Sequence, residues 1–299
     1  MAITIFGLMG DSAYKHKHVL QKIILHLTGW TRESFMTHYD DTIDSDMLDQ
    51  IKEKYDLYAI HHEPLEYILG YVEYGGLRFA VNKNTIIPRP ETEYMIEWVR
   101  QYMTVKQSDS PDEKSMILID VGTGSGVLGL SILHSHGSQI RQAFLIDISE
   151  DALAVARENY QHCLIEWQID DSIHVTIEKG NLLVSPSCTS GLLRSSQWPI
   201  VVVANLPYIP DETFDTNPDQ SLHYEPRVAF VGGDDGLDLY RVMFNQIHNS
   251  QFTMHNVVMF LEMMTWQVDI LKKEFEWLVF EEIKTFHFQI RIVKVNLKE

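Results

Sequence analysis

The stretch Asn205-Leu206-Pro207-Tyr208 follows the apolar run 200–204 and carries groups that could bind a planar nitrogen. A buried strand that ended there would bring two hydrogen-bond acceptors, the Asn205 side-chain oxygen and the Leu206 main-chain carbonyl, to one point. Such a pair can hold both N–H bonds of an amide or an exocyclic amine, and it can stabilise positive charge that develops on the nitrogen. Tyr208 would stack on the flat group. The motif alone leaves both kinds of nitrogen open.

A second group of candidate residues, Asp120-Val121-Gly122-Thr123-Gly124-Ser125-Gly126, lies between an expected strand and an expected helix. Glycines at such a place let the backbone turn sharply and approach a ligand closely. The glycines Gly124, Gly126 and Gly129 also meet the dinucleotide-binding spacing, so a dinucleotide is an alternative ligand. The acid Asp120 at the strand end favours a ligand with an ammonium group, which S-adenosylmethionine has and NAD lacks.

Two further strand ends supply groups for a nucleoside. Asp147 is placed to accept hydrogen bonds from ribose hydroxyls, and Asn181 and Leu182 could bind the adenine edge and cover its face. The expected cofactor-binding residues are Asp120, Gly122, Thr123, Gly124, Ser125, Gly126, Asp147, Ile148, Asn181, Leu182 and Asn205.

The elements that must position these residues alternate between strand and helix. The expected strands are 116–121, 143–147, 172–178, 200–204 and 257–262, and the expected helices are 127–134, 150–161, 237–249 and 266–274. This alternation predicts an α/β fold with a parallel sheet and helices on both faces. Two closing runs, 277–285 and 288–297, predict an antiparallel hairpin at the sheet edge. Before the sheet, 13–58 has helical spacing, and the run around Gly75-Gly76 predicts a β-hairpin.

Composition limits the class of protein and its partners. The net charge of −18 disfavours nucleic acid, because an acidic surface repels a phosphate backbone. Cys163 and Cys188 have no metal-ligand spacing, so we expect neither a disulfide framework nor a metal site, and a reducing, cytoplasmic setting. The sequence has no apolar run of the ~20 residues that a membrane span needs, so no membrane partner is expected. Methyl transfer to a nitrogen requires no metal or covalent nucleophile.

With these motifs, the sequence resembles the HemK/PrmC family over nearly its whole length. The family consists of class I methyltransferases that modify the glutamine in the Gly-Gly-Gln loop of peptide chain release factors. The resemblance is carried by 63–70, 76–79, 87–93, the 120–126 loop, 205–208, 225–227 and 232–237. The run Pro88 to Glu93 discriminates best, because general amine methyltransferases lack it.

The resemblance implies a Rossmann-like class I methyltransferase sheet after a small helical N-terminal domain. The implied divisions are 1–66 for substrate docking, 67–85 as a hairpin linker and 86–299 as the methyltransferase domain. It also implies S-adenosylmethionine as cofactor, transfer to the glutamine N5 and a release factor as partner; a monomer is expected. The implied catalytic residues are Asn205, Leu206, Pro207 and Tyr208, and Arg89, Pro90 and Glu91 join them in substrate binding.

The sequence departs from the family pattern at three places. Leu206 stands where the family usually has Pro; it keeps the carbonyl but is expected to loosen the loop. Asn181-Leu182 replaces an acid and an aromatic near the adenine, and Met263 replaces a usual Gly, while the Asp expected before the last strand is not evident. Two alternatives therefore stay open: an adenine N6-methyltransferase acting on RNA or DNA, since Leu206 also occurs in ribosomal RNA adenine dimethyltransferases, and a non-catalytic S-adenosylmethionine-binding protein. The charge and the Pro88 to Glu93 run favour glutamine.

Overall fold

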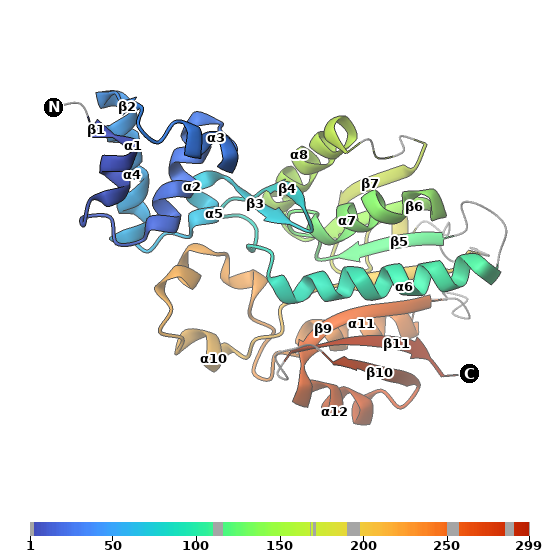
Figure 1. Cartoon of the computed structure of the whole chain (residues 1–299). Coiled ribbons are helices and arrows are strands. Elements are labelled where there is room, and N and C mark those ends of the chain that lie inside the picture. Colours follow the sequence, from blue (N-terminus) through green and yellow to red (C-terminus); the bar gives the residue numbers. More distant parts are fainter. Residues whose placement is uncertain are drawn as a thin grey trace. The chain divides into compact units, whose positions relative to one another are not determined.

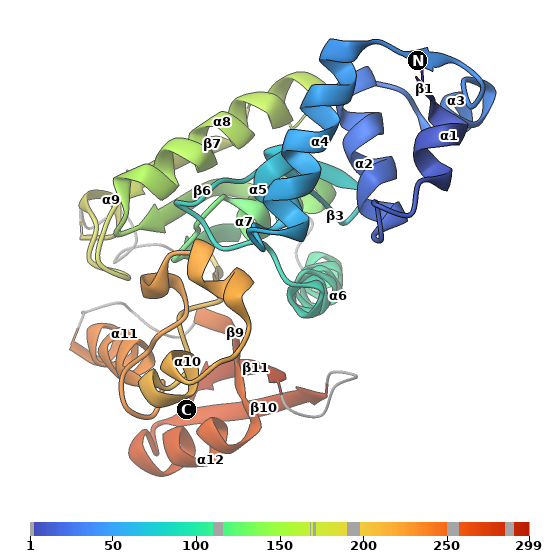
Figure 2. The same ribbon diagram turned by 90° about the vertical axis from the view of Figure 1, so that its left-hand side faces the viewer.

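The computed structural model describes residues 3–109, 116–167, 169, 172–189, 198–249, 257–284 and 290–298. The chain forms two compact units: Met1–Tyr71 with Asp219–Tyr224, and Val72–Pro218 with Glu225–Glu299. Figures 1 and 2 show the elements of both.

The first unit is helical. Its elements are β1 (Ile3–Thr4), α1 (Ile5–Gly10), α2 (Lys17–Thr28), α3 (Arg32–Thr37), β2 (Thr42–Ile43), α4 (Ser45–Ala59), α5 (Leu65–Leu69) and η3 (Gln220–Tyr224). Side chains cap three of the helices: Thr4 accepts from Gly7 N at α1, Thr31 from Ser34 N at α3, and Asp44 from Met47 N at α4. The apolar faces of α2 and α4 meet in a core that includes Ile51. The antiparallel pair β1–β2 was not expected from the helical spacing.

The second unit contains, in its described residues, a seven-stranded sheet of order β10-β11-β9-β8-β5-β6-β7. Its strands are β5 (Met116–Val121), β6 (Ile140–Asp147), β7 (His174–Lys179), β8 (Ile200–Ala204), β9 (Val257–Met264), β10 (Leu278–Lys284) and β11 (Ile290–Leu297). The strands β5 to β9 pair in parallel, and β11 pairs antiparallel with β9 and β10. The predicted Rossmann-like sheet with its antiparallel edge hairpin is therefore confirmed. The ends of the expected hairpin strands at Thr285 and Phe288 lie outside the described residues.

Helices cover both faces of this sheet. The helical elements are η1 (Pro90–Thr92), α6 (Glu93–Asp109), α7 (Val127–His136), η2 (Gly137–Gln139), α8 (Glu150–Glu166), α9 (Pro186–Thr189), α10 (Asp211–Asp215), η4 (Arg227–Ala229), α11 (Asp238–Asn249) and α12 (Thr265–Glu274). Alternate strand residues point to opposite faces: Val203 packs with α6, α7 and α8, whereas Val202 packs with α11 and α12. Because both faces are covered, β5 and β8 consist of buried residues throughout. None of the helices in the described part of the chain has the length and apolar character to cross a membrane.

The hairpin β3 (Tyr71–Tyr74) and β4 (Leu77–Ala80) is joined to the glycine loop by one buried side chain. The Asn159 amide exchanges hydrogen bonds with Ala80, donating to its O at 3.0 Å and accepting from its N at 2.7 Å. The same Nδ2 donates to Ser125 O at 2.8 Å. Asn159 is 2% exposed, so these contacts satisfy a buried amide and fix the hairpin beside the loop.

The segment after β8 is held by glycines that admit no side chain. Gly236 has φ +72°, and a Cβ there would overlap the Tyr208 carbonyl oxygen and lie 2.6 Å from Gln267 Nε2. A Cβ on Gly232 would overlap the Pro207 carbonyl oxygen. The Gln267 amide, 0% exposed, donates to Tyr208 O at 2.8 Å and Asp235 O at 2.9 Å. The glycine segment and α12 therefore fix the backbone of the Asn205-Tyr208 motif from one side.

We expect Gly236→Ala to lower the free energy of unfolding by roughly 3 kcal/mol or more, through left-handed strain plus overlap with Tyr208. Gly76→Ala is the matched control, because Gly76 has φ +79° but no atom lies within 4 Å of the place that an alanine Cβ would take. It should lose only about 1–2 kcal/mol. Denaturant unfolding of both variants measures the difference, and equal losses would show that the close packing on Tyr208 contributes little.

Candidate active site

A pocket of about 360 Å³ opens at the carboxyl ends of β5, β6 and β8. Among its lining residues are the sequence-predicted Gly122, Gly124, Asp147, Ile148, Asn181, Leu182, Asn205, Leu206 and Pro207. The carboxyl ends of parallel strands are where α/β sheets bind ligands. The fold therefore brings the expected nucleoside-binding residues and most of the catalytic motif to one cavity, of the size of a small-molecule site.

Asp120 does not line this pocket. Its side chain is 1% exposed, and its Oδ2 accepts from Thr123 Oγ1 at 2.6 Å and from Gly129 N at 2.9 Å. A Cβ on Gly129 would lie 2.9 Å from the same oxygen, so that glycine lets α7 approach the carboxylate. Burial raises the pKa of Asp120 to about 6, against the two hydrogen bonds that lower it. In the structure Asp120 holds the glycine loop together; the contact with an ammonium group stays a prediction.

Asp147 ends β6 and faces the pocket. Its Oδ2 accepts from Gly124 N at 2.9 Å, and its Oδ1 accepts from Ser149 N at 2.9 Å. Two backbone N–H groups thus fix the plane of the carboxylate, and each oxygen keeps a second acceptor position. The neighbouring Ile148 is 55% exposed and gives the same wall an apolar surface.

Asn181 and Leu182 lie in a tight turn after β7. Asn181 and Val184 pair through both backbone hydrogen bonds, and Leu182 has a left-handed φ of +56°. The side chain of Gln246 on α11 holds this turn, because it donates to Asn181 O at 3.2 Å and accepts from Leu183 N at 2.9 Å. A non-glycine residue in this conformation is strained, and such strain persists only where the surroundings enforce it.

Leu206 is 2% exposed and packs in the core between the sheet and α11 and α12. Its Cδ2 lies 3.0 Å from where a Cβ on Gly122 would be, so the leucine fills the space beside the glycine loop. A looser loop was expected because the proline ring is missing. In the structure side-chain packing constrains this position, and a looser loop than with proline stays a prediction.

The rest of the motif is anchored by polar side chains. Asn205 Nδ2 donates to Thr92 Oγ1 at 3.1 Å, and the Tyr208 hydroxyl donates to Glu262 Oε1 at 3.0 Å. The Tyr208 side chain does not line the pocket, although the residue is partly exposed. Burial and the neighbouring Glu262 carboxyl raise the pKa of the Tyr208 phenol well above its ordinary value, so the hydroxyl stays protonated.

Arg89 lies outside the pocket and forms an ion pair. Its Nη2 contacts Glu225 Oε1 at 2.5 Å, and the guanidinium lies over the Phe230 ring at 5.7 Å from the centroid. The second Glu225 oxygen accepts from Ile87 N at 2.8 Å. Glu225 is 5% exposed, so this carboxylate is a buried link between the segment 87–93 and the segment that supplies Pro226, Val228 and Ala229 to the pocket wall.

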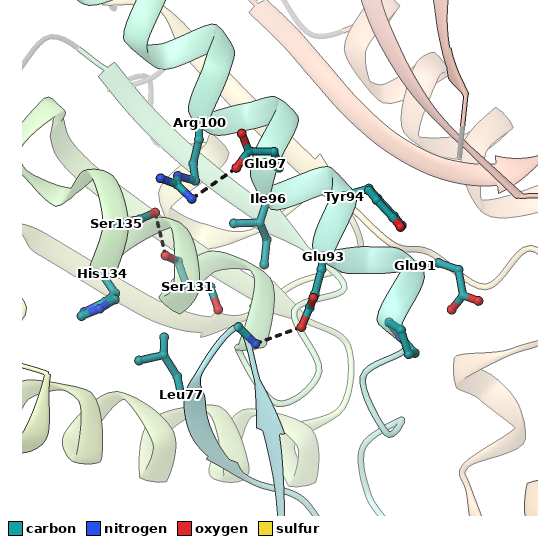
Figure 3. Close-up of a pocket in the computed structure, with 12 residues that line it drawn as sticks. Leu77, Glu91, Glu93, Tyr94, Ile96, Glu97, Arg100, Ser131, His134 and Ser135 are labelled. Carbon is teal, nitrogen blue, oxygen red and sulfur yellow. Dashed lines mark hydrogen bonds and ion pairs between the residues drawn. The ribbon is translucent and has the colours of Figure 1, made fainter. Parts of the chain in front are cut away.

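Pro90 and Glu91 line a different pocket of about 700 Å³ beside α6 and α7. Figure 3 shows Glu93 reaching toward the β3–β4 turn, where its Oε1 accepts from Gly75 N at 3.0 Å. In the same view Glu97 pairs with Arg100 at 3.2 Å. The predicted substrate residues 89–91 are therefore not among those that line the cofactor-sized pocket, and their contact with a substrate stays a prediction.

Sequence reasoning missed several residues of the pocket wall: Lys83, Asn84, Thr85, Ile86, Ser149, Asp151, Pro226, Val228, Ala229 and Leu239. The family resemblance could have pointed to two of these segments. Residues 83–86 directly precede the discriminating 87–93 run, and Pro226 lies in the 225–227 segment that carries the resemblance. It also missed Thr92 and Glu262 as partners of the motif. The described residues hold no group of three or more His, Cys, Asp or Glu that could bind a metal ion.

Two family models match the chain. Residues 15–70 match the PrmC N-terminal domain, and residues 112–171 match a methyltransferase domain. The first lies in the helical unit, and the second covers the strand, glycine loop and helix that form one wall of the pocket.

The names of curated relatives agree with both family models. A release factor glutamine methyltransferase of Clostridium acetobutylicum is 37% identical over 178 residues, 60% of this chain and 55% of that protein. One of Enterococcus faecalis is 29% identical over 79% of this chain and 75% of that protein. The chain thus spans just over half the length of the first relative.

A solved structure shares the fold. The N-terminal domain of human METTL16 superposes with a TM-score of 0.51, covers 97% of both chains and is 12% identical in sequence. At this identity the likeness concerns the fold alone. With the two domain matches and the curated relatives, the resemblance of the chain to the HemK/PrmC methyltransferases is confirmed.

Proposed function

We propose that this protein transfers a methyl group from S-adenosylmethionine to the side-chain amide nitrogen, N5, of the glutamine in the Gly-Gly-Gln loop of peptide chain release factors. The observation that carries the proposal is the position of Asn205, Leu206 and Pro207, which line the same pocket as the glycine loop and Asp147. The names of the curated relatives support the choice of substrate.

The pocket residues fit the cofactor. The Asp147 carboxylate, held by two N–H groups, has acceptor positions for the ribose hydroxyls. Ile148 and Leu182 supply apolar surface for the adenine, and Gly122 and Gly124, with φ of +70° and +56°, let the backbone approach the ligand. When bound, S-adenosylmethionine supplies an electrophilic methyl carbon attached to a sulfonium sulfur, and this sulfur is the leaving group, as a neutral thioether.

The chain's own residues would act on the nucleophile. An amide nitrogen is weak because its lone pair is delocalised, so it must be aimed and stabilised. Asn205 Oδ1 and Leu206 O would accept its two N–H bonds. Tyr208, which does not line the pocket in this structure, covers the amide plane only as the family resemblance implies. The nitrogen would bond to the methyl carbon as the carbon–sulfur bond breaks, and one N–H proton would pass to water. The two acceptors stabilise the positive charge that develops before the proton leaves.

A protein substrate also suits the charge of the molecule. A net charge of −18 disfavours a phosphate backbone, which supports glutamine over adenine in RNA or DNA. We infer that 1–66 docks the release factor, that 67–85 links the domains, and that 86–299 carries out the transfer. A monomeric state stays a prediction, as does the cytoplasmic location.

We expect the purified protein to transfer labelled methyl from S-adenosylmethionine to the glutamine of the Gly-Gly-Gln loop of a release factor, measured by peptide mass spectrometry. Asn205→Ala should lower kcat at least ~100-fold, because it removes an acceptor aimed at developing charge. Asn245→Ala is the control, since Asn245 is exposed on α11. Methylated adenine in RNA with unmodified release factor would overturn the glutamine assignment in favour of the adenine one.

We expect Asp147→Ala to weaken binding of S-adenosylhomocysteine roughly 10- to 100-fold, the loss of hydrogen bonds to a charged group. Titration calorimetry measures this without turnover. The control is Asp269→Ala, an exposed acid on α12. Unchanged affinity in Asp147→Ala would show that the ribose is held elsewhere.

A further inference from the structure

We propose that Thr92 and Glu262 are positioning residues that decide which end of the Asn205 amide faces the substrate. The inference rests on the proposed function, because it concerns the acceptor that would hold the glutamine nitrogen. It adds two residues that lie outside the pocket and outside the motif. Their role follows from the direction of three hydrogen bonds.

An asparagine side chain can be placed in two ways that have the same shape and opposite chemistry. With Oδ1 toward the substrate it accepts an N–H bond; with Nδ2 there, two donors face each other. Only neighbouring groups can decide between these orientations. A catalytic Asn that must present its oxygen therefore needs an obligate acceptor for its NH₂ group on the other side.

Thr92 is that acceptor. Its hydroxyl donates to Glu262 Oε2 at 2.9 Å, and Asn205 Nδ2 donates to the same hydroxyl oxygen at 3.1 Å. A hydroxyl carries one proton, and an ionised carboxylate can only accept. Since the Thr92 proton is committed to Glu262, only lone pairs remain for Asn205. The NH₂ end must then point at Thr92, which leaves Oδ1 for the pocket.

Glu262 also holds the other end of the motif. Its Oε1 accepts from the Tyr208 hydroxyl at 3.0 Å, so one carboxylate on β9 fixes both Asn205, through Thr92, and Tyr208 directly. The Tyr240 hydroxyl on α11 donates to the Glu262 carbonyl. Thr92 and Glu262 are 2% and 1% exposed, so water does not compete for these hydrogen bonds.

The direction of these hydrogen bonds depends on the charge of Glu262. Burial, with the nearby Glu91 carboxylate, raises the pKa of Glu262 to about 7 although hydrogen bonds from Thr92 and Tyr208 lower it. The phenols of Tyr74, Tyr208 and Tyr240 also lie around it, and burial, together with the Glu262 carboxylate, raises their pKa values. Above pH 7 Glu262 is ionised and can only accept. Below pH 7 the protonated carboxyl can donate to the Thr92 hydroxyl. That hydroxyl can then donate to Asn205, so the Asn205 amide is no longer held with its NH₂ group toward Thr92.

The first test removes and restores the Thr92 hydroxyl. In Thr92→Val, kcat for release-factor methylation should fall at least about tenfold, the value of one hydrogen bond, while the affinity for S-adenosylhomocysteine stays within about twofold. Thr92→Ser should recover kcat to within about threefold, since it keeps the hydroxyl. Thr104→Val, which removes a hydroxyl bonded to Arg100 O on α6, should leave kcat unchanged.

The second test does not require turnover. With ¹⁵N-labelled asparagine, the Asn205 NH₂ signal, assigned by its absence in Asn205→Asp, should exchange with water several-fold more slowly in the wild type and Thr92→Ser than in Thr92→Val. A third test uses turnover. We expect kcat of the wild type to rise between pH 6 and 8, and Glu262→Gln to lose that rise.

The outcomes separate the two proposals. A wild type that binds S-adenosylhomocysteine but does not methylate release factor overturns the function, and with it the substrate-facing role proposed here. An active wild type with undiminished kcat in Thr92→Val, or with Asn205 exchange that does not respond to Thr92, overturns the positioning role alone. If Glu262→Gln keeps the pH profile of the wild type, Glu262 has no part in positioning Asn205.

Discussion

A carboxylate buried on β9 is the constraint on which the candidate site depends. Removing the Glu262 charge from water is costly, and the hydroxyls of Thr92 and Tyr208 partly offset that cost. Because these two donors come from η1 and from the segment after β8, the carboxylate requires both segments to be in place at once. The same hydrogen bonds that make a buried acid tolerable thus determine the geometry of the motif. Asn205 and Thr92 are 113 positions apart in the sequence, and Tyr208 and Glu262 are 54 apart. The hydrogen bonds to the buried carboxylate explain how these distant residues act as one unit.

A second buried acid works in the same way on the neighbouring wall. Glu225 accepts from Arg89 and from the Ile87 backbone, which ties the 87–93 run to the segment that carries Pro226. The discriminating run therefore has a structural explanation in this molecule: its arginine pairs with Glu225, next to Pro226 of the pocket wall, and its threonine accepts from the Asn205 amide. Neither role requires direct contact with a substrate.

The strands of the sheet could be predicted, apart from their exact ends, because each is an apolar or alternating run, whereas the short helices α9 and α10 were not expected. The run Ile200–Ala204 is fully buried and has no polar residue. The run Met116–Val121 is also buried throughout, and the glycine loop follows it. The pocket could be predicted in part, because strand ends meet at one edge of a parallel sheet. What periodicity could not give is the pairing of distant polar side chains. Nothing in the local sequence of Thr92 or Glu262 indicates that they meet, and nothing indicated that Asp120 would bond to its own loop instead of lining the pocket.

The leucine at 206 shows how a motif can vary while its chemistry is kept. The proposed chemistry uses the Leu206 carbonyl and not its side chain, so the backbone path is what has to be preserved. That path is fixed after Leu206 by Gly232 against the Pro207 carbonyl and by Gln267 on the Tyr208 carbonyl. Before it, Asn205 is held by Thr92. With both sides anchored, position 206 needs only an apolar side chain that fills the space beside Gly122, and leucine does so at 2% exposure. Proline would constrain the same backbone through its ring, whereas here packing and the flanking hydrogen bonds supply the constraint.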